Sequence, residues 1–417
     1  MKPMGPIPPA FAGQRGELRI AGKSAAEWIE FAGDTPLFVY DAVIAAAQLA
    51  RLRAVMPAGL GIHYAVKANP ALIAAMAPLV DGLDIASAGE LAQVQAAAPG
   101  LPVSFAGPGK RDSELEAAII AGATINLESQ GEAFRALAIA DGLGIRPRLA
   151  VRVNPDFELR GSGMRMGGRA SPFGVEVAAV PMLVRELIAA GADWRGFHIF
   201  AGSQALDTGA IIETQTLTLA LAARLADAAG ASPPLVNLGG GFGIPYFAGD
   251  TPLDIAAIGA ALGDGLASRA AALGDSRFAI ELGRWLVGEC GVYLTRIIDR
   301  KQSGGQIFLV TDGGLHHQLA ASGNFGTVVR RNYPVALAHQ MGAEGTEVVN
   351  IVGCLCTPLD RLADQVMLPQ AAPGDIVALF LAGAYGATAS PQAFLGHPPP
   401  REIVAGLPDN PNAIFTC

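Results

Sequence analysis

The sequence predicts an α/β fold in which a (β/α)8, TIM-like barrel is joined to a second, β-rich domain. Three observations predict it. At 417 residues the chain is longer than one hydrophobic core usually supports. From about Pro36, short apolar runs alternate with alanine- and leucine-rich segments of helical periodicity. After Arg284 this alternation stops, and apolar segments broken by Gly and Pro follow without long helices.

Eight strands are expected in the alternating region, and helices between them favour a closed parallel barrel. We place the strands at residues 62–67, 82–87, 102–107, 124–129, 147–154, 196–202, 235–241 and 278–284. Further β segments are expected at 291–298, 306–311, 346–353 and 375–381. The predicted domains are 1–41, whose strands contribute to the β domain, 42–284 for the barrel and 285–417 for the C-terminal β domain.

Composition limits the class of protein. Apolar residues make up 51% of the chain and charged residues only 16%, which is typical of a compact enzyme rather than a disordered protein. The net charge of -8 leaves no basic excess for a phosphate backbone, so no nucleic-acid partner is expected. Residues 1–13 lack the order of a secretory signal, and no apolar run reaches the ~18 residues that span a bilayer. We therefore expect a cytoplasmic protein without a membrane partner.

The four cysteines are Cys290, Cys354, Cys356 and Cys417. So few in so long a chain do not indicate a disulfide framework, and no histidine pair stands beside them at zinc-ligand spacing. The sequence therefore predicts reduced thiols and no metal site.

Lys67 ends the first predicted barrel strand, in the segment YAVKANP (64–70). Functional residues of such barrels lie at the carboxyl ends of the strands, because the loops there surround an open mouth above a packed interior. A lysine amine held in a pocket can attack an aldehyde and form an imine. A charge that merely ends a strand explains Lys67, taken alone, equally well.

Two other predicted strands end in groups of the same kind. The run GGGFG (239–243) lets backbone N–H groups surround an anion, although a flexible turn explains an isolated triple glycine equally well. Glu281 and Arg284 place a carboxylate and a guanidinium at the end of the last strand, where an ordinary ion pair is the alternative. A buried carboxylate can keep a pyridinium nitrogen protonated, and an arginine binds phosphate. Together with Lys67, these groups predict a site for pyridoxal phosphate.

At this point the chain resembles a family: the alanine-racemase-like barrel decarboxylases of fold type III, which depend on pyridoxal phosphate and include diaminopimelate, ornithine and arginine decarboxylases. The resemblance runs from about Pro36 to Val404 and is nearest to the diaminopimelate decarboxylase branch. Motifs occur in the family's order: YAVKAN (64–69), DIASAGEL (84–91), RVNP (152–155), GSQ (202–204), GGGF (239–242), ELGR (281–284), Cys356 with Asp360, and GAYG (383–386).

The resemblance implies how the cofactor is held. Lys67 would form the Schiff base, and Glu281 would pair with the pyridine nitrogen. The remaining implied contacts lie around the phosphate, and they are Ser203, Gly240, Gly241, Arg284 and, from the second domain, Tyr385.

The resemblance also implies a head-to-tail homodimer with shared active sites. The loop that carries Cys356 would reach the active site of the partner, where Cys356 would donate a proton after carbon dioxide leaves. A small buried thiol is the alternative for Cys356, and we expect Cys354 to be such a thiol.

Two departures from the family's pattern bear on the site. The family stacks a histidine on the cofactor ring two residues before the Gly-Ser pair, and Phe200 stands there in this sequence. An aromatic ring can still stack, and His198, two residues earlier on the same strand, shares its face. We therefore keep both as cofactor-binding candidates, although a hydrogen-bonded core residue is an equal alternative for His198.

The second departure concerns the substrate. The family's acidic residue after the loop cysteine, which contacts the distal amine of a diamino acid, is Thr357 here. The segment 312–326, which includes Asn324, lacks the RPALY pattern that binds the far carboxylate of diaminopimelate. Thr357, Asp360 and Asn324 are the candidate substrate-binding residues. The segment resembles the subgroup that acts on carrier-attached amino acids or belongs to exosortase and polysaccharide clusters. His316 and His317 could line such a site or form a surface pair.

The sequence thus predicts a pyridoxal-phosphate-dependent carboxy-lyase of amino-acid metabolism, similar to diaminopimelate decarboxylase but with altered specificity residues. The alternative is a decarboxylase of a glutamyl-type amino acid tethered to an acyl carrier protein. An amino-acid racemase ranks lower, because it would need an acid on each face of the ring. A non-catalytic homologue also ranks lower, because Lys67, Glu281 and Arg284 are all retained.

Overall fold

Eight parallel strands close into a barrel, as the alternating pattern predicts. The computed structural model describes the whole chain except residues 162, 166, 169, 324–329, 408–411 and 416–417. Around the barrel the strands are β4 (Gly61–Ala65), β5 (Gly82–Ile85), β6 (Val103–Phe105), β7 (Thr124–Leu127), β8 (Arg148–Asn154), β11 (Asp193–Ile199), β13 (Leu235–Asn237) and β14 (Arg277–Leu282). Pairing of β14 with β4 closes the ring.

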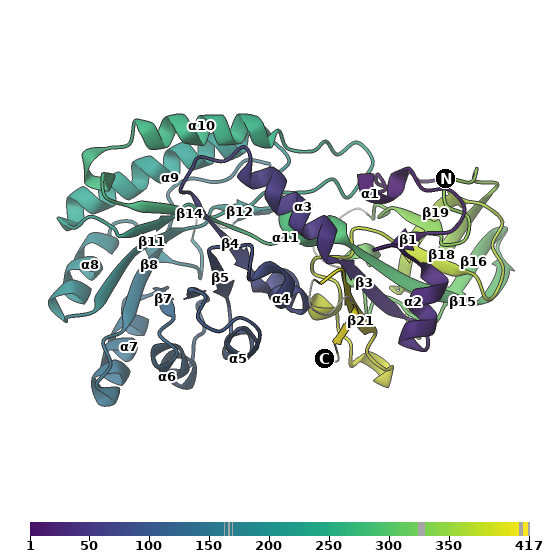
Figure 1. Cartoon of the computed structure of the whole chain (residues 1–417), viewed down its shortest axis with the longest axis horizontal. Helices are drawn as coiled ribbons and strands as arrows, with labels where there is room; N and C mark the ends of the chain where they lie inside the picture. The colour runs from purple at the N-terminus through teal and green to yellow at the C-terminus, as the bar shows by residue number, and fades with distance from the viewer. Residues whose placement is uncertain (162, 166, 169, 324–329, 408–411, 416–417) are drawn as a thin grey trace.

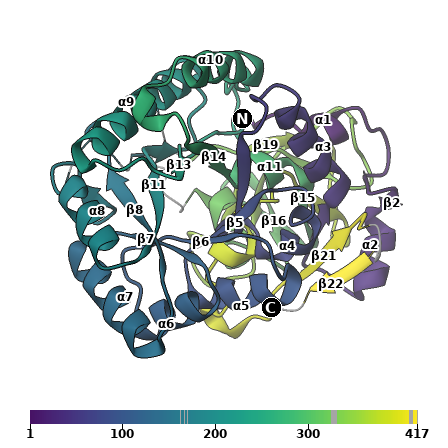
Figure 2. The same cartoon turned by 60° about the vertical axis from the view of Figure 1, so that its left-hand side comes forward.

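Helices surround these strands (Figure 2). They are α3 (Ala42–Arg53), α4 (Ile73–Met76), α5 (Ala88–Ala97), α6 (Asp112–Ile120), α7 (Gln130–Leu143), α8 (Val180–Ala189), α9 (Thr208–Ala229) and α10 (Ile255–Ala267). Local sequence fixes where several of them begin and end. The side chains of Ser87 and Ser129 cap α5 and α7 by accepting from backbone N–H groups of the first turn. Gly144 and Gly230 end α7 and α9 in the left-handed conformation.

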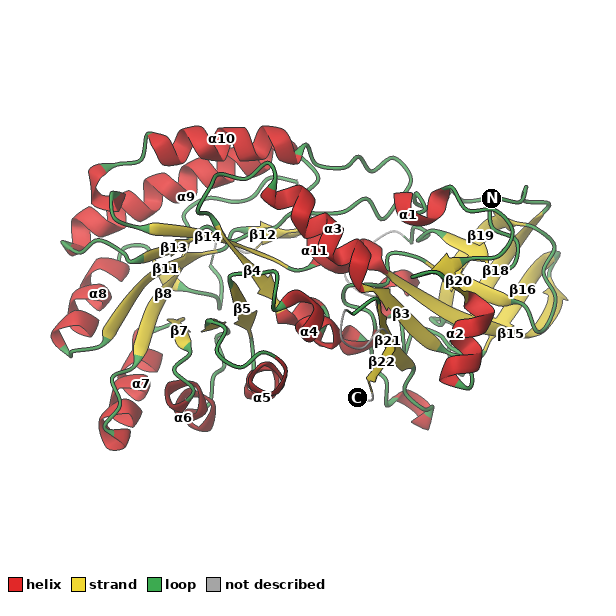
Figure 3. Cartoon of the chain, viewed as in Figure 1, coloured by secondary structure: helices red, strands yellow, loops and turns green. Residues whose placement is uncertain are grey.

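The second domain is β-rich and lies beside the barrel (Figures 1 and 3). Its main sheet has the order β19-β18-β16-β15-β3-β21-β22, and β20 joins β15 to β17. The strands are β3 (Leu37–Asp41), β15 (Gly291–Ser303), β16 (Gln306–Thr311), β17 (Val335–Leu337), β18 (Glu347–Val352), β19 (Arg361–Leu368), β20 (Ile376–Leu379), β21 (Arg401–Ala405) and β22 (Asn412–Phe415). The early strand β3 pairs with β15 and β21. The domain boundaries at 41/42 and 284/285 stay a prediction.

Short elements complete the described chain. They are α1 (Pro9–Ala12), β1 (Arg19–Ile20), β2 (Lys23–Ser24), α2 (Ala25–Ala32), β9 (Met164–Arg165), β10 (Val175–Glu176), β12 (Gly202–Ser203), α11 (Arg284–Val287) and seven 3-10 turns, η1 to η7. None of the helices in the described residues combines the length and apolar character that crossing a bilayer requires.

Seven of the eight barrel strands, all but β8, end earlier than the sequence predicts, and β4, β13 and β14 are three of them. Strand β4 stops at Ala65, and Lys67 lies in the 3-10 turn η1 (Val66–Ala68). Strand β13 stops at Asn237, because the chain then turns through Gly239 with a φ of 70°. Strand β14 stops at Leu282, and Arg284 begins α11. Apolar runs predicted the strands, but these polar ends belong to the loops at the barrel mouth.

Candidate functional site

A cavity of about 780 Å³ lies at the carboxyl ends of the barrel strands. The predicted residues that line it are Lys67, His198, Phe200, Ser203, Glu281 and Tyr385. A second cavity, of about 510 Å³, lies at the opposite end of the barrel. It is lined by Gly61, Arg148 and Arg277, the first residues of β4, β8 and β14. We take the first cavity as the candidate active site, because (β/α)8 barrels place their functional groups at the carboxyl ends.

Lys67 is exposed within a turn that the second domain holds in place. Its Nζ lies 5.9 Å from the centroid of the Phe200 ring. Next to it, Asn69 donates from Nδ2 to the carbonyl oxygen of Gly383 at 3.0 Å. The backbone N–H of Tyr385 donates to the carbonyl of Ala68 at 2.8 Å. Contacts between the two domains therefore hold the two residues that follow Lys67.

Glu281 and His198 face each other inside the barrel mouth. Oε2 of Glu281 lies 3.0 Å from Nε2 of His198 and 3.4 Å from Nδ2 of Asn237, and both side chains of the closer pair are buried. Burial alone would raise the pKa of Glu281, but His198, with Lys67 and Arg152, outweighs burial and lowers that pKa below its usual range. Neither ring nitrogen of His198 makes a well-directed hydrogen bond within the described residues. The site thus contains a stable anion beside an imidazole with unused hydrogen-bonding capacity.

The triple glycine forms a loop in which the backbone approaches its neighbours closely. A Cβ on Gly240 would lie 1.9 Å from the carbonyl oxygen of Glu281. Gly241 has a φ of 88°, and a Cβ there would lie 2.4 Å from the carbonyl oxygen of Gly202. Only glycine fits at these two positions, which explains the sequence signal.

Arg284 lies between two tyrosines near this loop. It donates from one terminal nitrogen to the hydroxyl of Tyr246 at 3.0 Å, and its guanidinium carbon lies 4.6 Å from the centroid of the Tyr385 ring. Its Nε has no hydrogen-bond partner within the described part of the chain. Because a buried charged donor without a partner costs free energy, this nitrogen suits an anionic ligand such as phosphate.

Ser203 and Phe200 complete the predicted cofactor-binding set. Ser203 belongs to β12, which pairs with β9, and it is half-buried in the cavity wall. Phe200 directly follows β11 and is also half-buried. Phe200 thus lies beneath the amine of Lys67, whereas His198 contacts Glu281.

The sequence analysis gave no role to a network of buried charges along another wall of the cavity. Arg152 donates to Oε1 of Glu128 at 2.7 Å, and Nζ of Lys110 donates to Oε1 of Glu132 at 2.9 Å. Burial lowers the pKa of Lys110, even though Glu132 opposes that shift. Arg152 stands in the RVNP motif, which is the one signal that pointed to this network.

A second overlooked pair joins Asp84, which lines the cavity, to His63 on the neighbouring strand. Nδ1 of His63 lies 3.4 Å from Oδ1 of Asp84, and both residues are buried. Burial would lower the pKa of His63, but the neighbouring Asp84 outweighs burial and raises it. Asp84 opens the DIASAGEL motif, whereas His63 has no motif of its own.

The predicted loop residues lie away from this cavity in the single chain. Cys356 is exposed and Thr357 half-buried, on the loop between β18 and β19, and neither lines the cavity. Asp360 is buried and accepts from the N–H groups of Leu315 and Leu355 at 2.6 and 2.9 Å, so it braces two loops. Asn324 lies outside the described residues.

The alternative of a surface pair for His316 and His317 is wrong. Their exposed fractions are 0% and 1%. Both lie in the loop after β16, where His317 contacts the hydroxyl of Tyr293 and the carbonyl oxygen of Pro398.

The observed groups fit pyridoxal phosphate. The cavity offers an accessible lysine amine and a buried carboxylate that stays ionised. The glycine loop and the partly unpaired Arg284 do not line the cavity but closely follow β13 and β14, at the same end of the barrel. These groups match the aldehyde, the ring nitrogen and the phosphate of this cofactor.

Comparison with known proteins supports the same chemistry. Residues 44–288 match the family described as pyridoxal-dependent decarboxylase, pyridoxal binding domain. The chain is similar to L-glutamyl-[BtrI acyl-carrier protein] decarboxylase of Niallia circulans, with 37% identity over 89% of each chain. It is also 30% identical to diaminopimelate decarboxylase of Methanothermobacter thermautotrophicus, over 95% of this chain and 92% of that one.

Among solved structures, diaminopimelate decarboxylase from Helicobacter pylori complexed with L-lysine is similar to the chain, with a TM-score of 0.80 and 25% identity. The similarity covers 93% of this chain and 95% of that one. Both the barrel and the β-rich domain are therefore shared with that protein.

Proposed function

The chain belongs to the family of pyridoxal-dependent decarboxylases and is a pyridoxal-phosphate-dependent amino-acid decarboxylase; we propose that its substrate is a glutamyl-type amino acid attached to a carrier protein. The observation that carries this proposal is the 37% identity to a decarboxylase of a carrier-bound glutamyl group. That identity exceeds the 30% found with a diaminopimelate decarboxylase. The proposal concerns the substrate, since the class of reaction follows from the family.

Thr357 supports the same substrate. A neutral hydroxyl stands where the diamino-acid enzymes that the chain resembles carry an acid for the distal amine. Without a carboxylate, an ammonium brought to this loop would lose its charged partner. A glutamyl thioester has no distal ammonium and therefore needs no carboxylate at this position.

We assign the cofactor contacts as follows. When bound, pyridoxal phosphate supplies an electron sink for the pair of electrons left as carbon dioxide departs. Lys67 would hold the cofactor aldehyde, and Glu281, whose carboxylate stays ionised, would hold a proton at the pyridine nitrogen. His198 lies 3.0 Å from Glu281 and would orient it, and Phe200 would stack on the cofactor ring.

The phosphate end is assigned to groups from several loops. Gly240 and Gly241 offer backbone N–H groups, and Ser203 offers its hydroxyl. Arg284 contributes charge, and Tyr385 closes the site from the second domain. The backbone N–H of Tyr385 also donates to Ala68, next to Lys67. The same residue would therefore close the phosphate end of the site and position the lysine amine.

We further propose that the active enzyme is a homodimer. Cys356 is exposed and does not line the cavity of its own chain, so a role in catalysis requires the cavity of a partner. There Cys356 would donate a proton to the substrate carbon, with Thr357, Asp360 and Asn324 shaping the neighbouring substrate site.

Release of carbon dioxide tests the substrate proposal. The holoenzyme is incubated with a glutamyl thioester of a carrier protein, the same thioester of a short pantetheine-like thiol, free glutamate, diaminopimelate, lysine, ornithine and arginine. Release from the carrier thioester is expected, and the Lys67→Ala variant is the control. Release from diaminopimelate alone would contradict the proposal and favour the second candidate, a diaminopimelate decarboxylase with an unusual specificity loop.

A further inference from the structure

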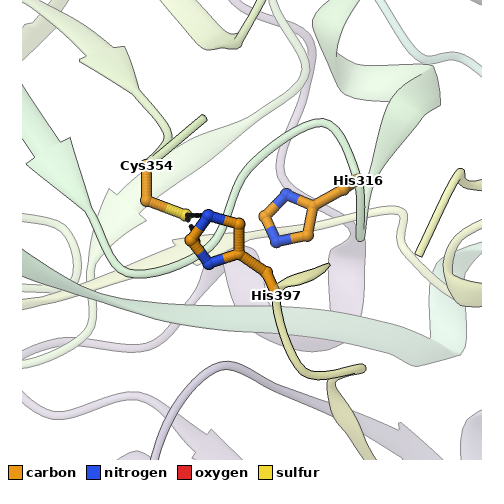
Figure 4. A group of neighbouring side chains, drawn as sticks. All are labelled: His316, Cys354 and His397. Carbon is orange, nitrogen blue, oxygen red and sulfur yellow. Dashed lines mark hydrogen bonds between the residues drawn. The ribbon is translucent and has the colours of Figure 1, made fainter. Parts of the chain in front are cut away.

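Three side chains of the second domain that are distant in sequence gather away from the cofactor cavity. His316 follows β16, Cys354 follows β18, and His397 follows the turn η7 (Phe394–Gly396) (Figure 4). One nitrogen of each ring and the sulfur lie within 4.8 Å of one another. Sγ of Cys354 lies 3.8 Å from Nδ1 and 3.9 Å from Nε2 of His397. These residues form the cluster His316–Cys354–His397.

His316 is the unusual member. It is fully buried, yet neither of its ring nitrogens has a hydrogen-bond partner within the described residues. Its neighbour His317 is equally buried but contacts the hydroxyl of Tyr293 through Nδ1 and the carbonyl oxygen of Pro398 through Nε2, both at 3.0 Å. Buried polar groups are nearly always paired, so an imidazole without a partner among the described residues has both nitrogens available for a ligand.

The loops of the cluster are held in place from outside. Asp360 accepts from the N–H of Leu315, next to His316, and from the N–H of Leu355, next to Cys354. The contact of His317 with Pro398 fixes the residue that follows His397. The thiol of Cys354 lies 3.4 Å from the carbonyl oxygen of Asp312. The three side chains are thus positioned before any ligand binds, as in metal sites whose supporting residues orient the ligands.

We infer that His316, Cys354 and His397 bind a divalent transition metal ion of the zinc class. Two imidazoles and a thiolate suit zinc and its neighbours and do not suit magnesium or calcium, which prefer oxygen. In a tetrahedral zinc site a nitrogen and a sulfur ligand lie about 3.5 Å apart. The separations of 3.8 and 3.9 Å between Cys354 and His397 are close to this value. Because the sulfur is almost equally far from both ring nitrogens, the His397 ring would turn on binding to direct one of them at the ion.

The site has an entry path and a balanced binding step. Cys354 and His397 are half-buried, so an ion can approach from their side while His316 closes the inner end. Binding forms one metal–sulfur and two metal–nitrogen bonds, and the Cys354 thiol releases its proton to solvent. The fourth position stays available for water. The bound ion would tie together the loops after β16, β18 and η7, including the segment that carries Cys356.

This inference does not depend on the identity of the substrate, and metal titration of the full-length holoenzyme tests it. The protein is stripped with a chelator and titrated with Zn²⁺ or Co²⁺, while metal content, Co²⁺ d–d absorption and the melting temperature are followed. One equivalent per chain is expected, with d–d bands typical of a tetrahedral site and a melting temperature that rises with metal concentration.

Matched variants decide which residues are involved. Cys354→Ser and His397→Asn should each weaken binding by more than about 100-fold, which is the upper range for losing a supporting residue. Cys356→Ser removes an exposed thiol two residues away and should change affinity by less than about twofold. If His316→Asn fails to fold, the variants at the half-buried residues Cys354 and His397 still test the assignment. Substoichiometric binding, or equal affinity in Cys354→Ser and Cys356→Ser, would overturn the assignment.

Discussion

Nε2 of His198 lies 3.0 Å from Oε2 of Glu281, although their strands β11 and β14 are separated in the barrel by β13. Asn237 of β13 reaches the same oxygen at 3.4 Å. Three strands therefore direct polar side chains at one point, and the surroundings hold the Glu281 carboxylate in its ionised form. An anion fixed at this place can keep a proton on a pyridine nitrogen.

The first prediction concerns acid stability. Because the pKa of Glu281 is lower in the folded protein than in the unfolded chain, its ionised form stabilises the fold above the unfolded value of 4.5. That contribution is lost as the pH falls from 4.5 through the folded pKa of about 2. Denaturant unfolding across this range should show a smaller loss of stability in Glu281→Gln than in wild type. Glu213→Gln, a partly exposed change, should keep the wild-type slope; equal slopes for both variants would contradict the assignment.

The second prediction concerns Lys67. Lys67→Ala should remove the visible absorbance of the lysine-bound cofactor and lower kcat/KM by at least about 10³-fold, since the covalent attachment is lost as a unit. Absorbance spectra and carbon dioxide release measure the two effects. Lys301→Ala, an exposed lysine of the second domain, should behave as wild type. Wild-type absorbance in Lys67→Ala would assign the Schiff base to another lysine.

The third prediction concerns the phosphate end. Arg284→Met should raise the Kd for pyridoxal phosphate by about 10- to 150-fold, because a hydrogen bond to a charged group contributes ~1.5–3 kcal/mol. Cofactor titration of the apoenzyme measures it. Arg277→Met, at the amino end of β14, the strand that precedes Arg284, is the matched control. An unchanged Kd in Arg284→Met would show that the guanidinium does not contact the phosphate.

The fourth prediction compares two glycines with nearly equal backbone conformations. Gly241 and Gly249 have φ values of 88° and 87°, so an alanine costs ~1–2 kcal/mol of left-handed strain at either position. A Cβ at Gly241 would also lie 2.4 Å from a carbonyl oxygen, whereas a Cβ at Gly249 meets nothing within 4 Å. Gly241→Ala should therefore lower both cofactor affinity and melting temperature, and Gly249→Ala only the melting temperature, by a smaller amount. Similar cofactor affinity in the two variants would exclude the loop from the cofactor site.

The fifth prediction concerns specificity. Thr357→Glu should raise the ratio of kcat/KM for lysine or diaminopimelate to that for the glutamyl carrier thioester by about tenfold or more, because the new carboxylate pairs with a distal ammonium. Thr216→Glu adds the same charge on an exposed face of α9 and should leave the ratio unchanged. A ratio that stays constant in Thr357→Glu would place the specificity residue elsewhere.

The barrel was predicted from the sequence because the alternation of apolar strands and helices is local, and Lys67, Glu281 and Arg284 stand out where strands end. Their loop conformations were not predicted, because an apolar run does not show at which residue its ladder of hydrogen bonds stops. The motifs marked Arg152 and Asp84, but the partners of these residues, Glu128 and His63, became visible only in the structure.

The sequence by itself determined the fold class and the cofactor, since the alternation of strands and helices and the motifs around Lys67, Gly240 and Glu281 are each local patterns in the chain. Tertiary structure alone decided which distant side chains meet. The contact of His198 with Glu281 depends on the register of three strands, and Cys354 meets His397 across 43 residues because separate loops pack together. Side-chain pairing across loops follows from packing and burial, and no local periodicity encodes it.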